Sequence, residues 1–266
     1  MTDKLSNAPI YYALAQAQFN HIGAMHKYVN EVQDQLRRCG YVFFETQQSA
    51  QVQMSAPMGN VITEPQISHV TQWSFTNADR TAGFILGPSS IIYHTTHYTT
   101  KDEFLPELIR GIKSVHSVVS LGHIERLGIR YLDAVIPFNN ERVAQYLVGG
   151  VQGPEYNGNK QFGLSESVFI TETGPLISSG TLVSRVYLSN SALGLPSDLG
   201  PIFLEPKERF RPTGPIDHAV IDTDHYVEGR MPLRLELIEL QLRNMHQTSK
   251  DVFRINVTPY ALKKWA

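Results

Sequence analysis

The sequence predicts an α+β protein with two related halves, each a mainly antiparallel sheet with helices packed on one face. Segments with apolar residues at every second position recur along the chain, and this period is typical of β-strands. Three other segments repeat apolar residues every three or four positions, which indicates amphipathic helices. Runs of strands that are followed by helices favour the α+β class over a parallel α/β fold.

The first half, residues 1–140, is expected to open with a strand over 13–20, where Ala15, Ala17 and Phe19 share one side. Residues 25–39 carry the first helical repeat and predict a helix that ends before Gly40. Residues 69–99 then predict three strands in a meander, with turns at the segments NADR and GPSS.

A second helix is predicted from residue 101 to residue 120, with Thr100 or Thr99 as its N-cap. Asp102 and Glu103 fall in its first turn, where the helix dipole favours acidic side chains. The segment HIERLGIRYLDAVIPF, residues 123–138, follows as a long strand.

The second half, residues 141–266, is expected to begin with a short helix over 140–148 and a glycine-rich linker over 149–163. The segments VFITETG, TLVSRVYLS and HAVIDTDHYV predict three strands, and a long loop over 191–215 separates the last two. A strong helix is predicted over 233–246, and Thr258 followed by Pro259 predicts the start of a terminal helix.

The two halves share an order of elements, which suggests a duplication. Each contains a strand that ends in His-Tyr, a polar turn, and an amphipathic helix with a proline near its start. We expect the halves to pack as one compact unit, with Trp73 and Trp265 in its core.

The composition limits the classes of partner that the chain is expected to bind. The 266 residues carry a net charge of −2, so no general attraction to nucleic acid or to anionic lipid is expected, although a local basic patch stays open. The chain has a single cysteine and no apolar run long enough to cross a membrane. We expect a cytoplasmic protein without a membrane segment, and the sequence is also compatible with a homo-oligomer.

The strand RLGIRYLD holds the first candidate binding site. Arg126, Gly128 and Arg130 project from one face, so the two guanidinium groups could clamp a carboxylate or a phosphate. Gly128 would leave space for the ligand between them. The alternative is that each arginine pairs with a neighbouring acidic side chain and covers the sheet.

The segment IDTDHY holds a candidate metal site. Asp222 and Asp224 lie on one strand face, and His218 shares that face because all three numbers are even. The alternative is a charged strand edge that discourages pairing with other chains. No phosphate-loop, dinucleotide-binding or nucleophile-elbow motif occurs, so no cofactor is expected and no catalytic residue is assigned.

Scattered short blocks carry a family resemblance: Asn7-Ala8-Pro9, Tyr98 with Phe104, RLGIRYLD, IDTDHY, and the terminal DVFRINVTPYALKKW. With these blocks the chain resembles a sporadically distributed family of uncharacterised bacterial proteins that has no assigned activity. The resemblance implies a bacterial protein inherited like defence or mobile-element genes, and it supplies no catalytic residue. The family block has an asparagine where this chain has Asp133, which leaves the role of that side chain open.

Three functional hypotheses remain. The first is a non-enzymatic interaction module from a bacterial accessory locus, of the defence or toxin–antitoxin type, whose partner protein is encoded nearby. The second is an enzyme that acts on a phosphate-bearing substrate or on nucleic acid through Arg126, Arg130 and the acidic row. The third is a nucleic-acid accessory protein that stacks bases on sheet aromatics, and the net charge disfavours it. Its stacking side chains would be Trp73, Phe75, Tyr93 and Tyr98.

Overall fold

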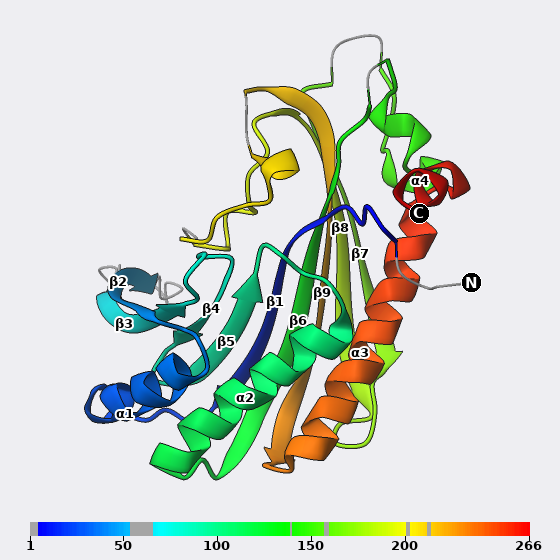
Figure 1. Cartoon of the computed structure of the whole chain (residues 1–266). Coiled ribbons are helices and arrows are strands. Elements are labelled where there is room, and N and C mark those ends of the chain that lie inside the picture. The colour runs from blue at the N-terminus through cyan, green and yellow to red at the C-terminus, as the bar shows by residue number, and fades with distance from the viewer. Residues whose placement is uncertain (1–4, 54–65, 139, 157–159, 201–202, 212–213) are drawn as a thin grey trace, which may run out of the picture.

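The computed structural model of the chain describes residues 5–53, 66–138, 140–156, 160–200, 203–211 and 214–266 (Figure 1). In these ranges a single antiparallel sheet of nine strands confirms the α+β class, and its strand order is β2-β3-β4-β5-β1-β6-β9-β8-β7. The strands are β1 (Ile10–Phe19), β2 (Phe43–Gln53), β3 (Gln66–Thr76), β4 (Ala82–Leu86), β5 (Ser90–Thr95), β6 (His123–Val135), β7 (Phe162–Glu172), β8 (Ser179–Ser191) and β9 (Ile216–Pro232).

Helices cover one face of this sheet. Helices α1 (Met25–Arg38), α2 (Lys101–Val119) and α3 (Leu235–Asn256) lie side by side on that face, and the short α4 (Pro259–Trp265) follows at the end of α3 (Figure 1). The other face is called the open face below. In the part of the chain that the structure describes, no helix is both long enough and apolar enough to cross a membrane.

The sheet runs without a break across the expected boundary at residue 140. Strand β6 pairs with β1 on one side and with β9 on the other, each over most of its length. One sheet therefore stands where two were expected, and this continuity does not confirm a division into two related halves.

The prediction of a helix over 140–148 is wrong. The structure has only a 3₁₀ turn at Val143–Gln145, after which Leu147 forms a β-bridge with Val257. A helix this short is marginal without tertiary support, and the glycines at 149 and 150 oppose its extension. Tyr146 and Leu147, which indicated a helix, are instead buried in a cluster with Val257 at the end of α3.

Helix α3, which was predicted over 233–246, is longer than expected. It continues ten residues past His246 because its buried face goes on through Ser249, Val252 and Asn256. The terminal helix has the predicted start, since the Thr258 hydroxyl accepts a hydrogen bond from the amide of Ala261. Strand β7 begins at Phe162, inside the expected linker, of which residues 157–159 lie outside the described residues.

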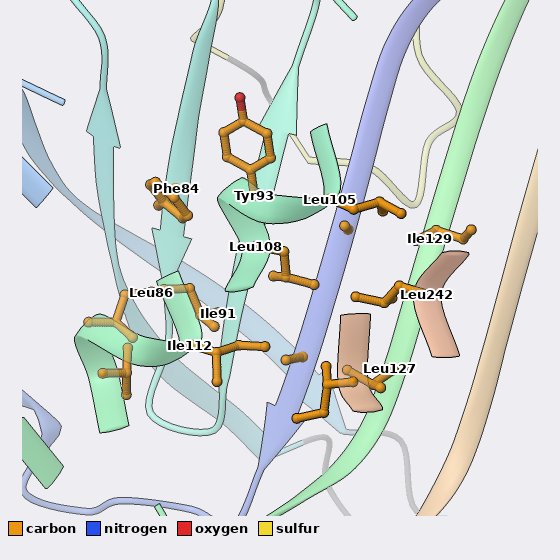
Figure 2. Packing of buried hydrophobic residues seen from close by; sticks show 14 of the residues in the cluster. Phe84, Leu86, Ile91, Tyr93, Leu105, Leu108, Ile112, Leu127, Ile129 and Leu242 are labelled. Atoms are coloured by element: carbon orange, nitrogen blue, oxygen red, sulfur yellow. The ribbon is translucent and has the colours of Figure 1, made fainter. Parts of the chain in front are cut away.

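The main core lies between the sheet and the helices. Leu105, Leu108 and Ile112 of α2 point toward the sheet, and Leu242 of α3 lies beside Ile129 of β6 (Figure 2). Gly111 allows α2 its close approach, because a Cβ atom there would meet the Phe84 ring at 2.6 Å. Trp73 and Trp265 are both buried, as expected, although in separate clusters.

A strap covers part of the open face. Within the expected loop over 191–215, Leu193 and Phe210 pack on Leu132 and Val220 of the sheet. The Tyr11 hydroxyl donates to the Gly194 carbonyl at 2.7 Å, and the Thr96 hydroxyl donates to the Glu205 carbonyl at 2.6 Å. Residues 201–202 and 212–213 of this loop lie outside the described residues.

Leu242→Ala should cost about 2–5 kcal/mol of unfolding free energy, because the Leu242 side chain is fully buried between α3 and the sheet. The matched control is Leu240→Ala on the same helix, where 45% of the residue is exposed and a much smaller loss is expected. Urea unfolding of both variants measures the difference. Equal losses would contradict the burial of this face of α3.

Candidate functional site

A charged network occupies the centre of the open face. Arg130 of β6 donates through Nε and Nη2 to the two carboxylate oxygens of Asp222 on β9, at 2.8 and 2.7 Å. It also donates to both oxygens of Asp198, which belongs to the strap, at 2.5 and 3.2 Å. Asp222 is completely buried, so its charge depends on these arginine contacts.

The network continues toward the edge of the sheet. Arg185 of β8 lies 3.7 Å from Asp222 and donates to Glu166 of β7 at 2.5 Å. Burial opposes the charge of Arg130, but its hydrogen bonds to Asp222 and Asp198 outweigh burial and raise its pKa. The hydrogen bond from Arg130 also holds the pKa of Asp198 below its usual value.

The two arginines predicted to bind a ligand share a face, but they do not form an open clamp. Arg126 stacks on the Tyr226 ring with its guanidinium carbon 4.3 Å from the centroid, and it donates to Gln16 at 2.7 Å. It also lies over Gly128, where a Cβ atom would meet its Nη1 at 3.2 Å. Its side chain fills the space that Gly128 was expected to leave for a ligand. Ligand binding by Arg126 and Arg130 stays a prediction, and both side chains already have protein partners.

The three residues of the predicted metal row have different interactions and do not form one site. Asp222 pairs with Arg130, and the Nδ1 atom of His218 lies 3.0 Å from the carbonyl oxygen of Ile216. Burial raises the pKa of Asp224, although Arg130 and Arg126 act in the opposite direction. Among the described residues, no group of three or more His, Cys, Asp or Glu side chains has the arrangement that a metal ion needs.

The aromatic residues considered for base stacking lie on the covered face. Phe75 is fully buried, Trp73 and Tyr93 are nearly so, and Tyr98 packs against the same core. Helices α1 and α2 cover this part of the sheet, which leaves no aromatic platform for bases there (Figure 1). The base-stacking hypothesis therefore loses the side chains on which it was built.

Strand β7 presents the most exposed apolar surface on the described sheet. Its alternate residues face the open side, because Val168 pairs with Val183, which pairs with Asp224, which in turn pairs with Arg130. Four large apolar side chains on that side make up the β7 apolar row. They are Phe162 (61% exposed), Leu164 (52%), Val168 (58%) and Ile170 (75%).

The strand that carries this row is also an edge of the sheet. In the described residues β7 pairs with β8 alone, so the main chain on its other side is available for pairing. Edge strands in natural proteins are usually protected by lysine, proline or inward-pointing charges. The only charged residue between Phe162 and Ile170 is Glu166, whose charge is compensated by Arg185.

Sequence reasoning missed this surface, although a signal was present. The segment FGLSESVFI alternates apolar and small or polar residues, which normally marks a strand with one buried face. The period is therefore correct for a strand, but it cannot tell a buried face from a binding face. Glycines around residue 160 led to a predicted linker instead of the start of β7.

No family model matches the chain, and no curated protein is significantly similar to it. The resemblance to a sporadic bacterial family therefore stays a prediction.

Arg130→Met should cost about 3–5 kcal/mol of unfolding free energy, because it leaves the buried Asp222 without its main counter-charge and with only Arg185 at 3.7 Å. Adding Asp222→Leu to this variant should recover most of the loss, since a buried pair can be replaced by apolar side chains. Arg126→Met, at a more exposed pair, is the matched control and should cost less. Urea unfolding tests all three, and an equal cost for the single and double variants would mean that packing, not charge, sets the loss.

Proposed function

We propose that the chain is a non-enzymatic interaction module that binds a partner protein by strand addition at β7. The observation that carries this proposal is the β7 apolar row on an edge strand whose outer main chain is available for pairing. In strand addition, main-chain hydrogen bonds hold an extended segment to a sheet edge, and pockets for alternate side chains select it. The partner would present an extended segment with apolar residues at alternate positions.

The size of the row supports an interaction surface. Full burial of a side chain such as Val, Leu, Ile or Phe stabilises a complex by about 1.5–3 kcal/mol. Association first costs roughly 4–15 kcal/mol in lost freedom of motion, so a scattered pair of apolar contacts would not suffice. Four aligned side chains together with a row of main-chain hydrogen bonds are of the required magnitude.

The centre of the row adds selectivity. Glu166 stands between Leu164 and Val168, and Arg185 reaches it from the neighbouring strand. A partner strand would therefore meet apolar contacts on both sides of a compensated ion pair. A small polar residue at the centre of its own apolar pattern would fit best, because burial of a bare charge there is costly.

The enzyme hypothesis is the alternative, and the same network weakens it. The donors of Arg130 are engaged by Asp222 and Asp198, so a phosphate would have to displace a buried ion pair. The proposal of a bacterial, cytoplasmic protein from a defence or toxin–antitoxin type locus rests on the family resemblance. The same resemblance supports a partner that is encoded by a neighbouring gene.

The relation between the halves belongs to this proposal as well. Outward from the central pair β1 and β6, the sheet runs β5-β4-β3 on one side and β9-β8-β7 on the other. A helix follows the inner strand of each side, α2 after β5 and α3 after β9. This matching order supports an ancestral duplication in which β7 corresponds to β3, a strand that has β2 as a further neighbour. On this view, the partner segment takes the position at β7 that β2 takes at β3.

The test is co-expression of the tagged chain with the products of the genes that flank its own. The double change Val168→Lys plus Ile170→Lys should reduce the amount of co-purified partner at least tenfold, because two charges would be buried against apolar side chains, and tenfold corresponds to about 1.4 kcal/mol.

The matched control adds the same charge to the opposite face of the same strand, through Ser165→Lys plus Ser167→Lys. The control should keep most of the partner, since its lysines stay outside the β7 apolar row. Equal loss from both double variants, or equal retention, would contradict the proposal. A dimer of the chain itself that only the Val168/Ile170 variant breaks would identify a second copy as the occupant of β7.

A further inference from the structure

A cavity of about 390 Å³ lies on the helix-covered side of the sheet, and no residue of β7 lines it. The first turn of α2 and the C-terminal half of α3 form its walls, while β6 and β9 form its floor. The volume is in the range of small-molecule sites, which usually measure roughly 300–1,000 Å³. The lining combines apolar and aromatic residues with polar and charged side chains, among them Asp102, Lys101 and Lys250.

Asp133 of β6 is the unusual member of this lining. The residue is 7% exposed, and its carboxyl makes no ion pair or hydrogen bond with any other side chain or main-chain group in the described ranges. Asp102 at the same cavity differs, because it is paired with Arg243 of α3. A buried carboxyl without a counter-charge is costly, and burial raises the pKa of Asp133 to about 8.

The surroundings of Asp133 are suited to a positive charge. The rings of Tyr98 and Tyr131 meet edge to face at a centroid distance of 5.6 Å, and Phe253 lines the same cavity. Aromatic faces attract cations, and groups of aromatic rings are used to bind ammonium groups. The Thr223 hydroxyl in the floor is buried and has no hydrogen-bond partner among the described residues, so an acceptor is available there.

His246 of α3 adds a neutral polar group to the cavity. Its Nδ1 atom lies 2.9 Å from the Tyr131 hydroxyl, which ties the ring to the floor. Burial, reinforced by Lys101 and Lys250, lowers the pKa of His246 to about 4. The imidazole is therefore uncharged at neutral pH and does not compete with a ligand for Asp133.

We propose that this cavity binds a small organic amine, with the ammonium group of the ligand paired with Asp133 and its apolar part held among Tyr98, Tyr131 and Phe253. The ligand supplies the counter-charge that the protein does not provide in its described part. Thr223 offers an additional acceptor for an ammonium N–H. This site is separate from the β7 edge, so it stands or falls independently of strand addition.

Binding of an amine should release a proton from Asp133. The free carboxyl is mostly protonated at neutral pH, whereas the form that pairs with an ammonium group is ionised. Affinity should therefore rise about tenfold per pH unit from about pH 6 to about pH 7 and level off above about pH 8. A neutral ligand that accepts a hydrogen bond from the protonated acid would show the opposite trend, with affinity falling above about pH 8.

The tyrosine and histidine neighbours of Asp133 titrate outside the range from about pH 6 to about pH 8. Tyr131 on β6 and Tyr98 before α2, and also Tyr11 on the open face of the sheet, have pKa values raised by burial, so they titrate above the range. His246 on α3 titrates below it. At the mouth of the cavity, Arg243 lowers the pKa of Asp102, and the remaining charged groups are Lys101 and Lys250.

The experiment measures binding of three probes of similar shape by titration calorimetry and ligand-observed NMR: 2-phenylethylamine, 2-phenylethanol and phenylacetate. Only the amine should bind saturably at millimolar concentration, with the stated rise in affinity with pH. Equal binding of the alcohol, a pH-independent affinity for the amine, or no saturable binding of the amine would each overturn the proposal.

Two variants complete the test. Asp133→Asn keeps the size and hydrogen-bonding groups of the side chain but removes the charge, so amine affinity should fall at least tenfold. Asp102→Asn, which removes a carboxyl at the mouth of the same cavity, should change it by less than about threefold. A similar loss in both variants would mean a general electrostatic effect and would overturn the assignment to Asp133. The pH profile of the unmodified chain needs no variant, so the proposal stays testable if Asp133→Asn does not fold.

Discussion

The ion pair between Arg130 and Asp222 determines how the other charged residues of the open face are arranged. It joins the neighbouring strands β6 and β9, and both side chains are buried. Such a pair is stable only when the remaining donors and acceptors are also used. Asp198 from the strap takes the outer donors of Arg130, and Arg185 from β8 approaches the outer oxygen of Asp222. Register, strap position and the orientation of β8 are thereby linked to one guanidinium group.

The same sheet uses its two faces and its edge for different purposes. On the covered face an apolar core holds three helices (Figures 1 and 2), and the cavity at Asp133 lies between the first turn of α2 and the C-terminal half of α3. On the open face charges are paired inside the sheet, and apolar side chains collect toward the β7 edge. Each of the two proposed sites therefore has its own lining elements.

Short sequence patterns predicted most of the helices and strands. Contacts between residues far apart in the sequence could not be predicted in this way. Thr100 as an N-cap and the meander β3-β4-β5 follow from short sequence patterns, and the structure confirms them. Arg130 and Asp222 were both singled out as ligand-binding residues, but not as partners of each other, because only the register between β6 and β9 brings them into contact. The cavity needed the ends of two helices and two strands at once, and no single segment carries that information. The helix expected near residue 145 shows the reverse case, in which a local pattern was overruled by a contact with the end of α3.

The order of the strands in space has a consequence during synthesis of the chain. Strand β6 leaves the ribosome roughly 80 residues before its neighbour β9, an interval of several seconds at about 5–20 residues per second. For that time the nascent sheet ends in a long open edge, of the kind that chaperones recognise and that promotes aggregation. Arg130 then lies on this edge strand without Asp222, and a charged side chain on an edge strand opposes premature association with other chains.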